Sequence, residues 1–366
     1  MNNPTTDSIN RQRSIATQAG QTGKIALIVI ASSLLLSPAA QAFEVKVSGQ
    51  VSRMVVIPDD AAGVEIQYQD IGWSGSRFRF TGSEEMDNGI KVGFRFEIQA
   101  RNNNAGTNGA QLQNNGDNQD NRYQDVYFSG DFGKISFGKG DGASNGSTEV
   151  DMSGTSLASA APLQDNWGGY EIAPGIAWRT VYTIDDGLSR QNRVRYDTPN
   201  ASGFSLAVSI NQGNASEVAV RYKGDILGGK FGAAIFTATS NDVQPPGGVP
   251  VVDGDDLFGG SASLKLNSGL NFTVAISERD LEATGVTREA TFLKVGYKTG
   301  KHAFAVDVGD SEGNVAGTEG ETFGFTYAFF PHPGVELFAM VRELDSSGVA
   351  GASSVDLLAF GTRVKF

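Results

Sequence analysis

The segment Phe204-Ser-Leu-Ala-Val-Ser-Ile210 alternates large apolar side chains with small or polar ones. Successive side chains of a β-strand point to opposite faces of its sheet, so this period of two predicts a strand with one apolar and one polar face. Leu270-Asn-Phe-Thr-Val-Ala-Ile276 and Phe323-Gly-Phe-Thr-Tyr-Ala-Phe329 repeat the pattern. Such strands are typical of an antiparallel sheet that meets water on one side, either in a soluble sandwich or in a membrane barrel.

The connections between the strands favour the barrel. Seven short turn sequences, such as Asp131-Phe-Gly133 and Asn267-Ser-Gly269, alternate with eight longer polar segments, which predicts sixteen strands. Bacterial barrels have an even number of strands, short turns on the periplasmic side and long loops on the outside. The predicted fold class is therefore all-β, an antiparallel transmembrane β-barrel of sixteen strands over residues 43–366.

Charged side chains lie on the face opposite the apolar one. In Arg77-Phe-Arg-Phe80 the two phenylalanines share one face, which leaves Arg77 and Arg79 on the other. Arg95, Arg193 and Arg195 take the same kind of position in later strands. A charge turned toward lipid at mid-membrane depth costs about 2–4 kcal/mol. These side chains are therefore expected to face water, in a lumen or in bulk solvent.

Residues 1–42 are predicted to be a signal peptide. Arg11, Arg13 and Lys24 precede the apolar run 25–36, and the small-residue site Ala40-Gln-Ala42 follows it. This order is typical of a secretory signal with cleavage before Phe43. The run is shorter than the roughly 20 residues that a helix needs to cross a bilayer. Its flanks disfavour the alternative of a buried helix or a membrane anchor.

The composition argues against several classes of function. The formal net charge is −12, and an acidic chain is a poor candidate for nucleic-acid binding. The chain has no cysteine, which excludes zinc–thiolate and cysteine-nucleophile sites. A Ser–His–Asp hydrolase needs a histidine beside a serine, whereas the two histidines, His302 and His332, follow or lie in short turns and are more typical of interfacial residues. We expect no enzymatic activity.

No cofactor is expected either. The run Asp253-Gly-Asp-Asp256 offers the oxygen ligands that calcium prefers, but it lacks the later glutamate of a full calcium-binding loop. We interpret the run as a solvated loop, and calcium binding at the acidic loops is not predicted.

One long segment, residues 141–177, interrupts the alternation. It is rich in Gly, Ser and Ala, with acidic residues at Glu149, Asp151 and Asp165. Connections longer than about 12–15 residues without secondary structure are uncommon in compact domains and are usually functional or disordered. A long loop on one strand of a closed sheet has room to fold inside it. We predict that this loop folds into the barrel and narrows its channel.

The chain resembles the general porins of Gram-negative outer membranes. The resemblance is carried by the order and spacing of Ser76-Arg-Phe-Arg-Phe-Thr-Gly-Ser-Glu84, Asn88-Gly-Ile-Lys-Val-Gly-Phe94, Arg122 through Gly138, Arg193-Val-Arg-Tyr-Asp-Thr-Pro199 and the terminal Phe366. It implies a homotrimer of sixteen-stranded barrels in the outer membrane, each with its third outer loop bent into the lumen. It also implies passive diffusion of small hydrophilic solutes and ions, contact with outer-membrane lipids, and insertion by the barrel assembly machinery, with Phe366 as the C-terminal assembly signal.

The resemblance further implies that basic residues on the wall face acids on the loop across a narrow part of the channel. Arg77 and Arg122 resemble the family's wall arginines. The expected basic wall is Arg77, Arg79, Arg95, Arg122, Arg193 and Arg195. The loop lacks the Pro-Glu-Phe-Gly-Gly signature of enterobacterial porins, so its acidic side is inferred from position alone. That acidic side is expected to be Glu149 and Asp151, with Asp165 as a weaker third.

Two alternatives stay open at the level of the sequence. A solute-selective channel with a true binding site would need a stacked track of aromatic side chains along the lumen, whereas most aromatic residues fall on the apolar face. A secreted or surface β-sandwich adhesin would turn its polar face to bulk water and would purify without detergent.

Overall fold

The computed structural model describes residues 43–61, 63–64, 66–102, 117–241 and 254–366. The chain divides into two units, Met1–Phe43 and Glu44–Phe366, and the structure described below is that of the second. The predicted signal peptide, residues 1–42, lies outside the described residues. Among the residues that are described, no helix combines the length and the apolar character needed to cross a bilayer.

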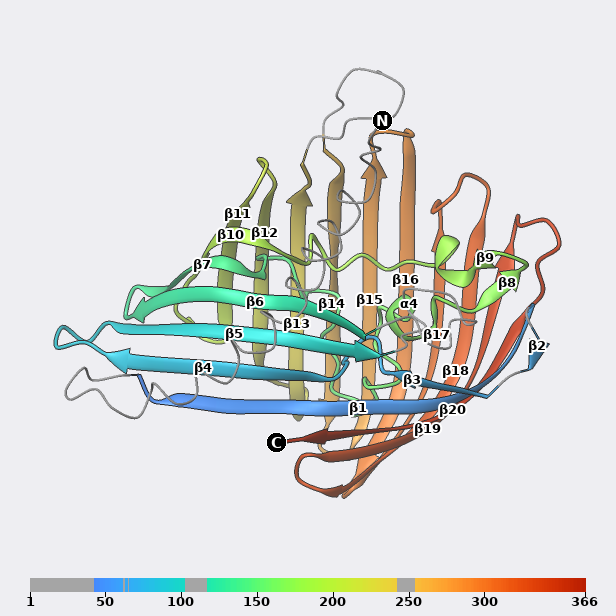
Figure 1. Ribbon diagram of the computed structural model, residues 1–366, viewed down its shortest axis with the longest axis horizontal. Helices are drawn as coiled ribbons and strands as arrows, with labels where there is room; N and C mark the ends of the chain where they lie inside the picture. The colour runs from blue at the N-terminus through green and yellow to red at the C-terminus, as the bar shows by residue number, and fades with distance from the viewer. Residues whose placement is uncertain (1–42, 62, 65, 103–116, 242–253) are drawn as a thin grey trace, which may run out of the picture. The chain divides into compact units, whose positions relative to one another are not determined.

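Sixteen long antiparallel strands of the described chain form one closed sheet (Figure 1). Neighbours in sequence pair with one another, and β1 closes the sheet by pairing with β4 through residues 45–50 and with β20 through residues 50–59. The predicted all-β barrel of sixteen strands is confirmed. The strands are β1 (Val45–Asp60), β4 (Arg77–Glu85), β5 (Lys91–Asn102), β6 (Asp117–Gly130), β7 (Gly133–Asp141), β10 (Arg190–Asp197), β11 (Phe204–Asn211), β12 (Ser216–Ile226), β13 (Gly229–Thr239), β14 (Asp256–Leu266), β15 (Leu270–Leu281), β16 (Val286–Thr299), β17 (His302–Glu312), β18 (Glu319–His332), β19 (Val335–Ser347) and β20 (Val355–Lys365).

Most connections follow the predicted alternation of short turns and longer segments, but residues 212–215 and 282–285, at positions expected to be longer, connect their strands in only four residues each. Between β12 and β13 the turn consists of two residues, Leu227 and Gly228, with φ angles of 52° and 68°. Positive φ at both central residues is the geometry of the two-residue hairpin turn whose twist matches that of the strands. The first long connection contains two short strands, β2 (Gly63–Val64) and β3 (Gln67–Asp70). They pair with residues 59–60 and 53–56 of β1, which follow the part of β1 that pairs with β4.

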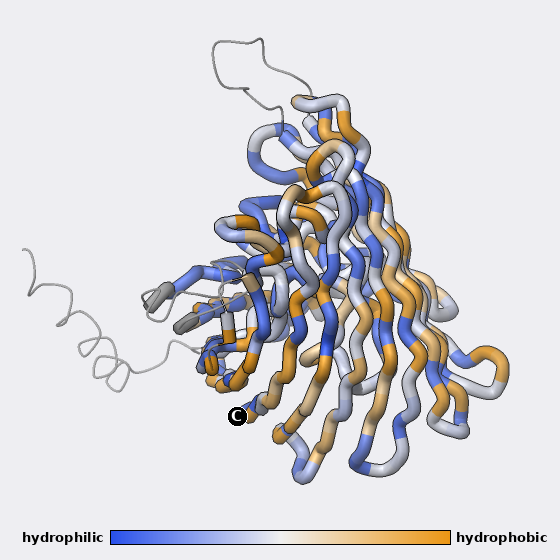
Figure 2. Tube along the Cα trace, turned by 90° about the vertical axis from the view of Figure 1, so that its right-hand side faces the viewer, coloured by the Kyte–Doolittle hydropathy of each residue, from blue (hydrophilic) through white to orange (hydrophobic). Residues whose placement is uncertain are grey.

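The two faces of the barrel wall differ in polarity. Along β15, Phe272, Val274 and Ile276 are 43%, 38% and 45% exposed, whereas Asn271 and Thr273 between them are buried. Figure 2 shows the same alternation of apolar and polar positions along other strands. A soluble sandwich would bury its apolar face, because a large exposed apolar surface is rare on water-soluble monomers. Here the apolar face points outward, which contradicts the β-sandwich adhesin alternative.

The connection between β7 and β10 spans residues 142–189 and is longer than the predicted 141–177. It contains the helix α4 (Gln164–Trp167), the short strands β8 (Glu171–Ala173) and β9 (Ile176–Ala177), and the 3-10 turn η2 (Trp178–Thr180). We call residues 142–189 the inner segment; its residues contact polar side chains of β12, β14 and β16 on the face opposite the exposed apolar one.

Aromatic residues of the inner segment form the main apolar core of the described chain. Its largest members are fully buried and pack against inward-facing apolar residues of β1, β16, β19 and β20, such as Phe292 and Met340. Burying a large side chain contributes about 1.5–3 kcal/mol, so this core holds the inner segment firmly on one side of the barrel. The aromatic members from the segment are Trp167, Tyr170, Trp178 and Tyr182.

Candidate functional site

The backbone of the inner segment is fixed by polar side chains on successive strands. Ser144 N–H donates to Glu217 Oε2 on β12 at 2.9 Å. Val150 N–H and Met152 N–H donate to the hydroxyls of Ser261 and Ser263 on β14, at 2.9 and 3.0 Å. Buried backbone N–H groups need partners of this kind. The small polar residues that alternate with apolar ones in the strands therefore serve to hold the segment.

Buried ion pairs tie the inner segment to the same side of the wall. Lys294 Nζ on β16 lies 2.7 Å from Asp151 Oδ2, and the two side chains are 0% and 5% exposed. Asp185 accepts hydrogen bonds from Arg288 on β16, the shortest at 2.6 Å. Ser159 donates to Asp307 at 2.6 Å, and Asp307 in turn pairs with Arg342. Asp151, expected on the acidic side of the channel, is thus a buried partner of Lys294.

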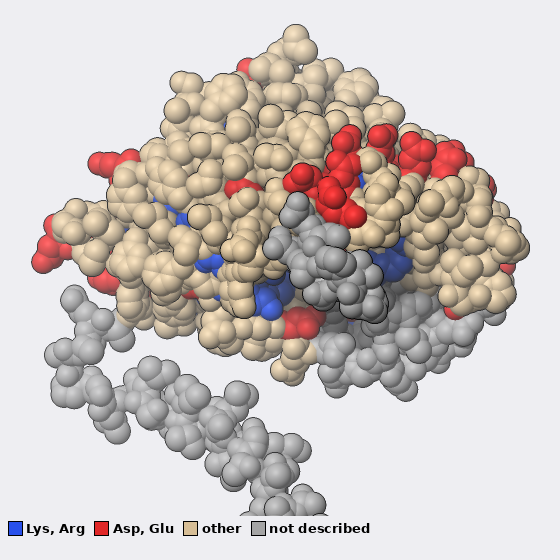
Figure 3. All heavy atoms as spheres, turned by 90° about the horizontal axis from the view of Figure 1, so that it is seen from above, with Lys and Arg blue, Asp and Glu red and all other residues tan. Residues whose placement is uncertain are grey.

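A cavity of about 610 Å³ remains between the inner segment and the wall formed by β4–β7 and the start of β10. Basic residues line the wall side, and all the acidic lining residues except Asp141, the last residue of β7, belong to the inner segment. Figure 3 shows basic side chains recessed below a rim where acidic side chains gather. The basic lining residues are Arg77, Arg79, Arg95, Arg122 and Arg190, and the acidic ones are Asp141, Glu149, Asp165, Asp185 and Asp186.

Glu97 on β5 organises the arginines of this wall. Its side chain is fully buried and accepts from Arg79 Nε at 2.5 Å and from Arg122 Nε at 2.8 Å. Arg77 and Arg95 approach the same carboxylate at 3.5 and 3.7 Å. One carboxylate faces four guanidinium groups, so the cluster retains a positive charge. Hydrogen bonds between ionised partners are about twice as strong as neutral ones, which makes Glu97 the anchor of the cluster.

A β-bulge brings Arg122 to this cluster. Glu97 pairs with Tyr123 and Ile98 pairs with Asn121, so Arg122 is an extra residue on β6. Such a bulge re-aims side chains that strict alternation would send to opposite faces. Arg122 and Tyr123 consequently both face inward, and Arg122 also donates to Gln99 at 2.6 Å.

The structure brings together only part of the predicted basic wall. Arg77, Arg79, Arg95 and Arg122 line the cavity, whereas Arg193 and Arg195 do not. Arg193 is buried and pairs with Asp125 at 2.7 Å. Arg195 pairs with Asp197 and donates to Gly142 O, both at 2.6 Å. These two arginines hold the start of the inner segment in place.

Several lining residues were missed from the sequence. Three of them, Asp185, Asp186 and Arg190, lie beyond the predicted end of the loop at residue 177. The two adjacent aspartates were the signal in the sequence that could have indicated a longer loop. Tyr123 carried no signal of its own, because a tyrosine in an alternating strand is common. Glu97 does not line the cavity, and the alternation of β5 places it on the charged face together with Arg95.

Two residues that were expected on the acidic side, Glu149 and Asp165, line the cavity together with Asp186. Asp186 accepts hydrogen bonds from the N–H groups of Gly146 and Thr148, at 2.5 and 2.9 Å. Burial raises the pKa of Asp186 to about 6, although these hydrogen bonds work in the other direction. Burial, reinforced by the charges of Asp186 and Asp165, also raises the pKa of Glu149 well above its usual range.

We expect the charge preference of the cavity to change with pH. An acid with a raised pKa is ionised above that pKa and neutral below it, so lowering the pH through about 6 removes negative charge from Asp186. The pKa of Glu149 is raised in the same direction by its burial. The ratio of anion to cation permeability should therefore rise between about pH 7.5 and 5. Reversal potentials under a salt gradient measure this ratio. The rise should be smaller in Asp186→Asn, and a wild-type ratio that stays constant over this range would contradict the assignment.

Phe366 follows β20 as the last residue of the sequence, and its backbone pairs with the first half of β1. Its N–H donates to Gly49 O at 3.0 Å, and Gly49 N–H donates to Phe366 O at 2.9 Å. Its ring covers Gly49 so closely that a Cβ there would lie 2.6 Å from Phe366 Cζ. Glycine is thus required at position 49 for this contact.

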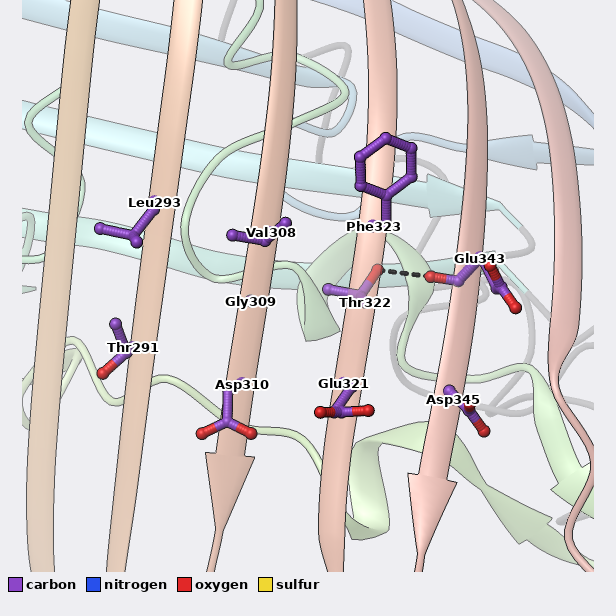
Figure 4. A pocket seen from close by; sticks show the side chains of 10 residues that line it. All are labelled: Thr291, Leu293, Val308, Gly309, Asp310, Glu321, Thr322, Phe323, Glu343 and Asp345. Atoms are coloured by element: carbon purple, nitrogen blue, oxygen red, sulfur yellow. Dashed lines mark hydrogen bonds between the residues drawn. The ribbon is translucent and has the colours of Figure 1, made fainter.

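A separate acidic cluster lies on the outward face of the barrel (Figure 4). Carboxylate oxygens of Asp310, Glu319 and Glu321 lie within 4.8 Å of one another, near the exposed side chains of Val308 and Phe323. This cluster is on the other side of the wall from the cavity and takes no part in it.

The run 253–256, interpreted as a solvated loop, is described only from residue 254. Asp255 is buried and accepts from Arg279 Nη2 on β15 at 2.6 Å. The expectation of a solvated carboxylate is therefore wrong for Asp255, because the arginine of the neighbouring strand compensates its burial. Asp256 is exposed.

Solved structures that resemble this chain include porins and an outer-membrane channel. The chain is similar to an anion-selective porin from Comamonas acidovorans, with 18% identity over 89% of this chain and 100% of that chain and a TM-score of 0.65. It is also similar to the channel DcaP of Acinetobacter baumannii, with 11% identity over 91% of this chain and 100% of that chain and a TM-score of 0.61. It is similar as well to OmpT of Vibrio cholerae, with 13% identity over 90% of this chain and 99% of that chain and a TM-score of 0.56.

Sequence comparison leads to the same group of proteins. No curated protein sequence matches the chain. The model of the Gram-negative porin family matches residues 26–349, which is most of the chain. The chain therefore belongs to the Gram-negative porin family.

Proposed function

We propose that this porin is a general diffusion channel whose width and charge preference are set by the cavity between the inner segment and the wall of β4–β7. As a Gram-negative porin, the protein is an outer-membrane channel for passive diffusion. A barrel of about 16–18 strands leaves an aqueous channel, whereas one of about eight strands is filled by its side chains. The proposal concerns what narrows this channel and which residues face the solute.

The single observation that carries the proposal is the position of the inner segment. Its backbone bonds to inward-facing side chains of β12 and β14, and its ion pairs reach β16. The space that it leaves beside β4–β7 is the cavity of about 610 Å³. These contacts support a segment that narrows the lumen and leaves one polar passage along the arginine wall.

The charges on the two sides of the passage support a transverse field. Arginines line the wall, and Glu149, Asp165 and Asp186 line the segment. Constriction size and rings of charge determine selectivity in such pores. A field of this kind orients dipolar solutes and disfavours apolar ones, which cannot replace the contacts with water that they lose.

The remaining assignments follow from this function. A passive channel requires no catalytic group and no cofactor, and we assign neither. A homotrimer in contact with outer-membrane lipids is supported by the trimer form of the OmpT structure, with 13% identity over 89% of this chain and 100% of that chain and a TM-score of 0.56. Phe366 at the open end of β20 is assigned as the signal for the barrel assembly machinery.

The alternative of a solute-selective channel receives little support from the cavity. Its aromatic lining residues, within the described part of the chain, are Trp73 and Tyr123. Two aromatic side chains fall short of the stacked track that a selective binding site for a ring-shaped solute would need.

Swelling of liposomes that contain the refolded mature protein tests the function. We expect neutral sugars to enter at rates that fall smoothly with their size and do not saturate with concentration. Rates that saturate for one sugar would favour the solute-selective channel, and liposomes that remain impermeable to the smallest sugar would contradict a diffusion channel.

Replacing Glu149 by Gln together with Asp165 by Asn should shift the channel toward anions, because the field of the arginine wall would be less compensated. In water a unit charge about 8 Å from an ion contributes about 0.5 kcal/mol, so we expect at least an about twofold rise in the ratio of anion to cation permeability. Asp225→Asn, which changes a 70% exposed residue near the end of β12, is the matched control. Equal reversal potentials for the double variant and the control would remove Glu149 and Asp165 from the passage.

A further inference from the structure

Tyr123 lies in the middle of the basic wall, between two of its arginines. The side chain is only 5% exposed. The guanidinium carbon of Arg95 lies 3.1 Å from the centre of its ring, and that of Arg190 lies 5.6 Å from it. A guanidinium within about 6 Å of an aromatic ring centre is attracted by the negative charge on the ring face.

The hydroxyl of Tyr123 reaches a second arginine through a carboxylate. It donates to Asp141 Oδ2 at 2.5 Å, and Asp141 Oδ1 lies 3.0 Å from Arg190 Nε. The four residues come from β5, β6, β7 and β10, which are neighbours in the sheet. One tyrosine therefore connects two arginines across four strands.

Arg95 depends on this ring more than the other arginines of the wall do. Its contact with Glu97, at 3.7 Å, is the longest of the four that converge on that carboxylate, and its Nε is buried without a hydrogen-bond partner. Arg79 and Arg122, by contrast, donate directly to Glu97. Among the described residues, the ring of Tyr123 is thus the contact that fixes the plane of the Arg95 guanidinium.

An alternative position for Arg95 is close at hand. Arg95 and Asp125 are directly opposite in the register of β5 and β6, and Asp125 at present pairs with Arg193. A long arginine side chain released from the ring would gain by turning toward this carboxylate, because opposite charges on facing positions attract. That movement would withdraw a positive charge from the cavity.

We propose that Tyr123 is a positioning residue that sets the charge preference of the channel by holding Arg95, and through Asp141 also Arg190, over the cavity. The inference rests on the proposed function and adds a residue and a cause to it. The solutes whose passage it favours are small anions, because it keeps two cationic side chains directed toward the water-filled side. Replacing the ring by an aliphatic side chain should therefore make the channel less anion-preferring.

The test measures reversal potentials of the full mature protein in planar bilayers under a potassium chloride gradient. Tyr123→Leu removes both the ring and the hydroxyl, and we expect the ratio of anion to cation permeability to fall by about twofold. Tyr123→Phe keeps the ring, so it should retain most of the wild-type ratio. Arg95→Gln should lower the ratio about as much as Tyr123→Leu does.

A double-mutant cycle separates positioning from a direct effect of the tyrosine. If Tyr123 acts mainly through Arg95, the double variant Tyr123→Leu/Arg95→Gln should lower the ratio little more than either single variant, because coupled residues show non-additive effects. Full additivity, or an unchanged ratio in Tyr123→Leu, would overturn the inference. Tyr127→Leu is the matched control, since Tyr127 also contacts a cation, Lys134 at 4.7 Å, but does not line the cavity.

A second variant covers the case in which Tyr123→Leu does not fold. Arg95→Lys keeps the charge but loses the flat group that stacks on the ring. We expect its ratio to fall relative to the wild type, whereas a simple count of charges predicts no change, and an unchanged ratio would again overturn the inference. Failure of the proposed function would be distinguishable, because the wild-type protein would then form no channels.

Discussion

Replacing Lys294 by Met is expected to destabilise the protein by about 3–5 kcal/mol, because it leaves a buried carboxylate without its partner. Asp151 is 5% exposed and pairs with Lys294 Nζ at 2.7 Å. Lys294 also donates to the backbone carbonyl of Ser159, so the same substitution removes two contacts that hold the inner segment, one at Asp151 and one at Ser159. We therefore expect a larger or noisier conductance in addition to the loss of stability.

Unfolding of the reconstituted protein by urea measures the change in stability. The matched variant Lys294→Met/Asp151→Leu removes both charges and should regain much of the loss, because a buried ion pair replaced by apolar residues is often neutral or stabilising. If Lys294→Met unfolds at the wild-type urea concentration and keeps the wild-type conductance, the ion pair does not hold the segment.

Replacing Glu97 by Gln should give the largest shift of the channel toward anions. The substitution removes the one carboxylate that faces Arg77, Arg79, Arg95 and Arg122 and keeps the shape of the side chain. A unit charge about 8 Å away in water contributes about 0.5 kcal/mol to an ion, with opposite sign for anions and cations, so the permeability ratio should rise about two- to fivefold. Reversal potentials under a salt gradient measure it.

The control for this variant is another buried inward acid. Glu336 is 6% exposed and pairs with Arg363 at 2.6 Å, but it does not line the cavity. Glu336→Gln should cost stability with a smaller change in the permeability ratio. Equal shifts in the two variants would mean that the arginine cluster around Glu97 has no special influence on passing ions.

The barrel could be predicted from the sequence because its causes are local. The period of two in segments such as 204–210 and 270–276 sets which side chains point outward, and the turn residues set where each strand ends. The same alternation predicts that Arg77 and Arg79 lie on the water-facing side of the sheet, and both line the cavity.

Residues of the cavity that depend on irregular or distant structure could not be predicted. Alternation places Arg122 and Tyr123 on opposite faces, and only the bulge between β5 and β6 turns both inward. Asp151, which was expected in the channel, does not line the cavity; it pairs with Lys294 across 143 positions of sequence, and no local pattern indicates that pairing.

The extent of the inner segment was underestimated for a related reason. The run rich in small residues suggested a loop that ends at residue 177, but the segment continues to residue 189. Its aromatic residues were not recognised as a core, because the apolar residues against which they pack come from strands at the two ends of the chain, such as Val56 and Leu357. Arg190, the first residue of β10, was missed as a consequence.

Single-channel conductance of the refolded mature protein in a planar bilayer tests most directly whether this barrel is an open, water-filled channel. We expect large steps that are proportional to voltage and that close in threes, as a homotrimer requires. Protein that is folded and inserted but shows no conductance steps would contradict the proposed channel between the inner segment and the arginine wall.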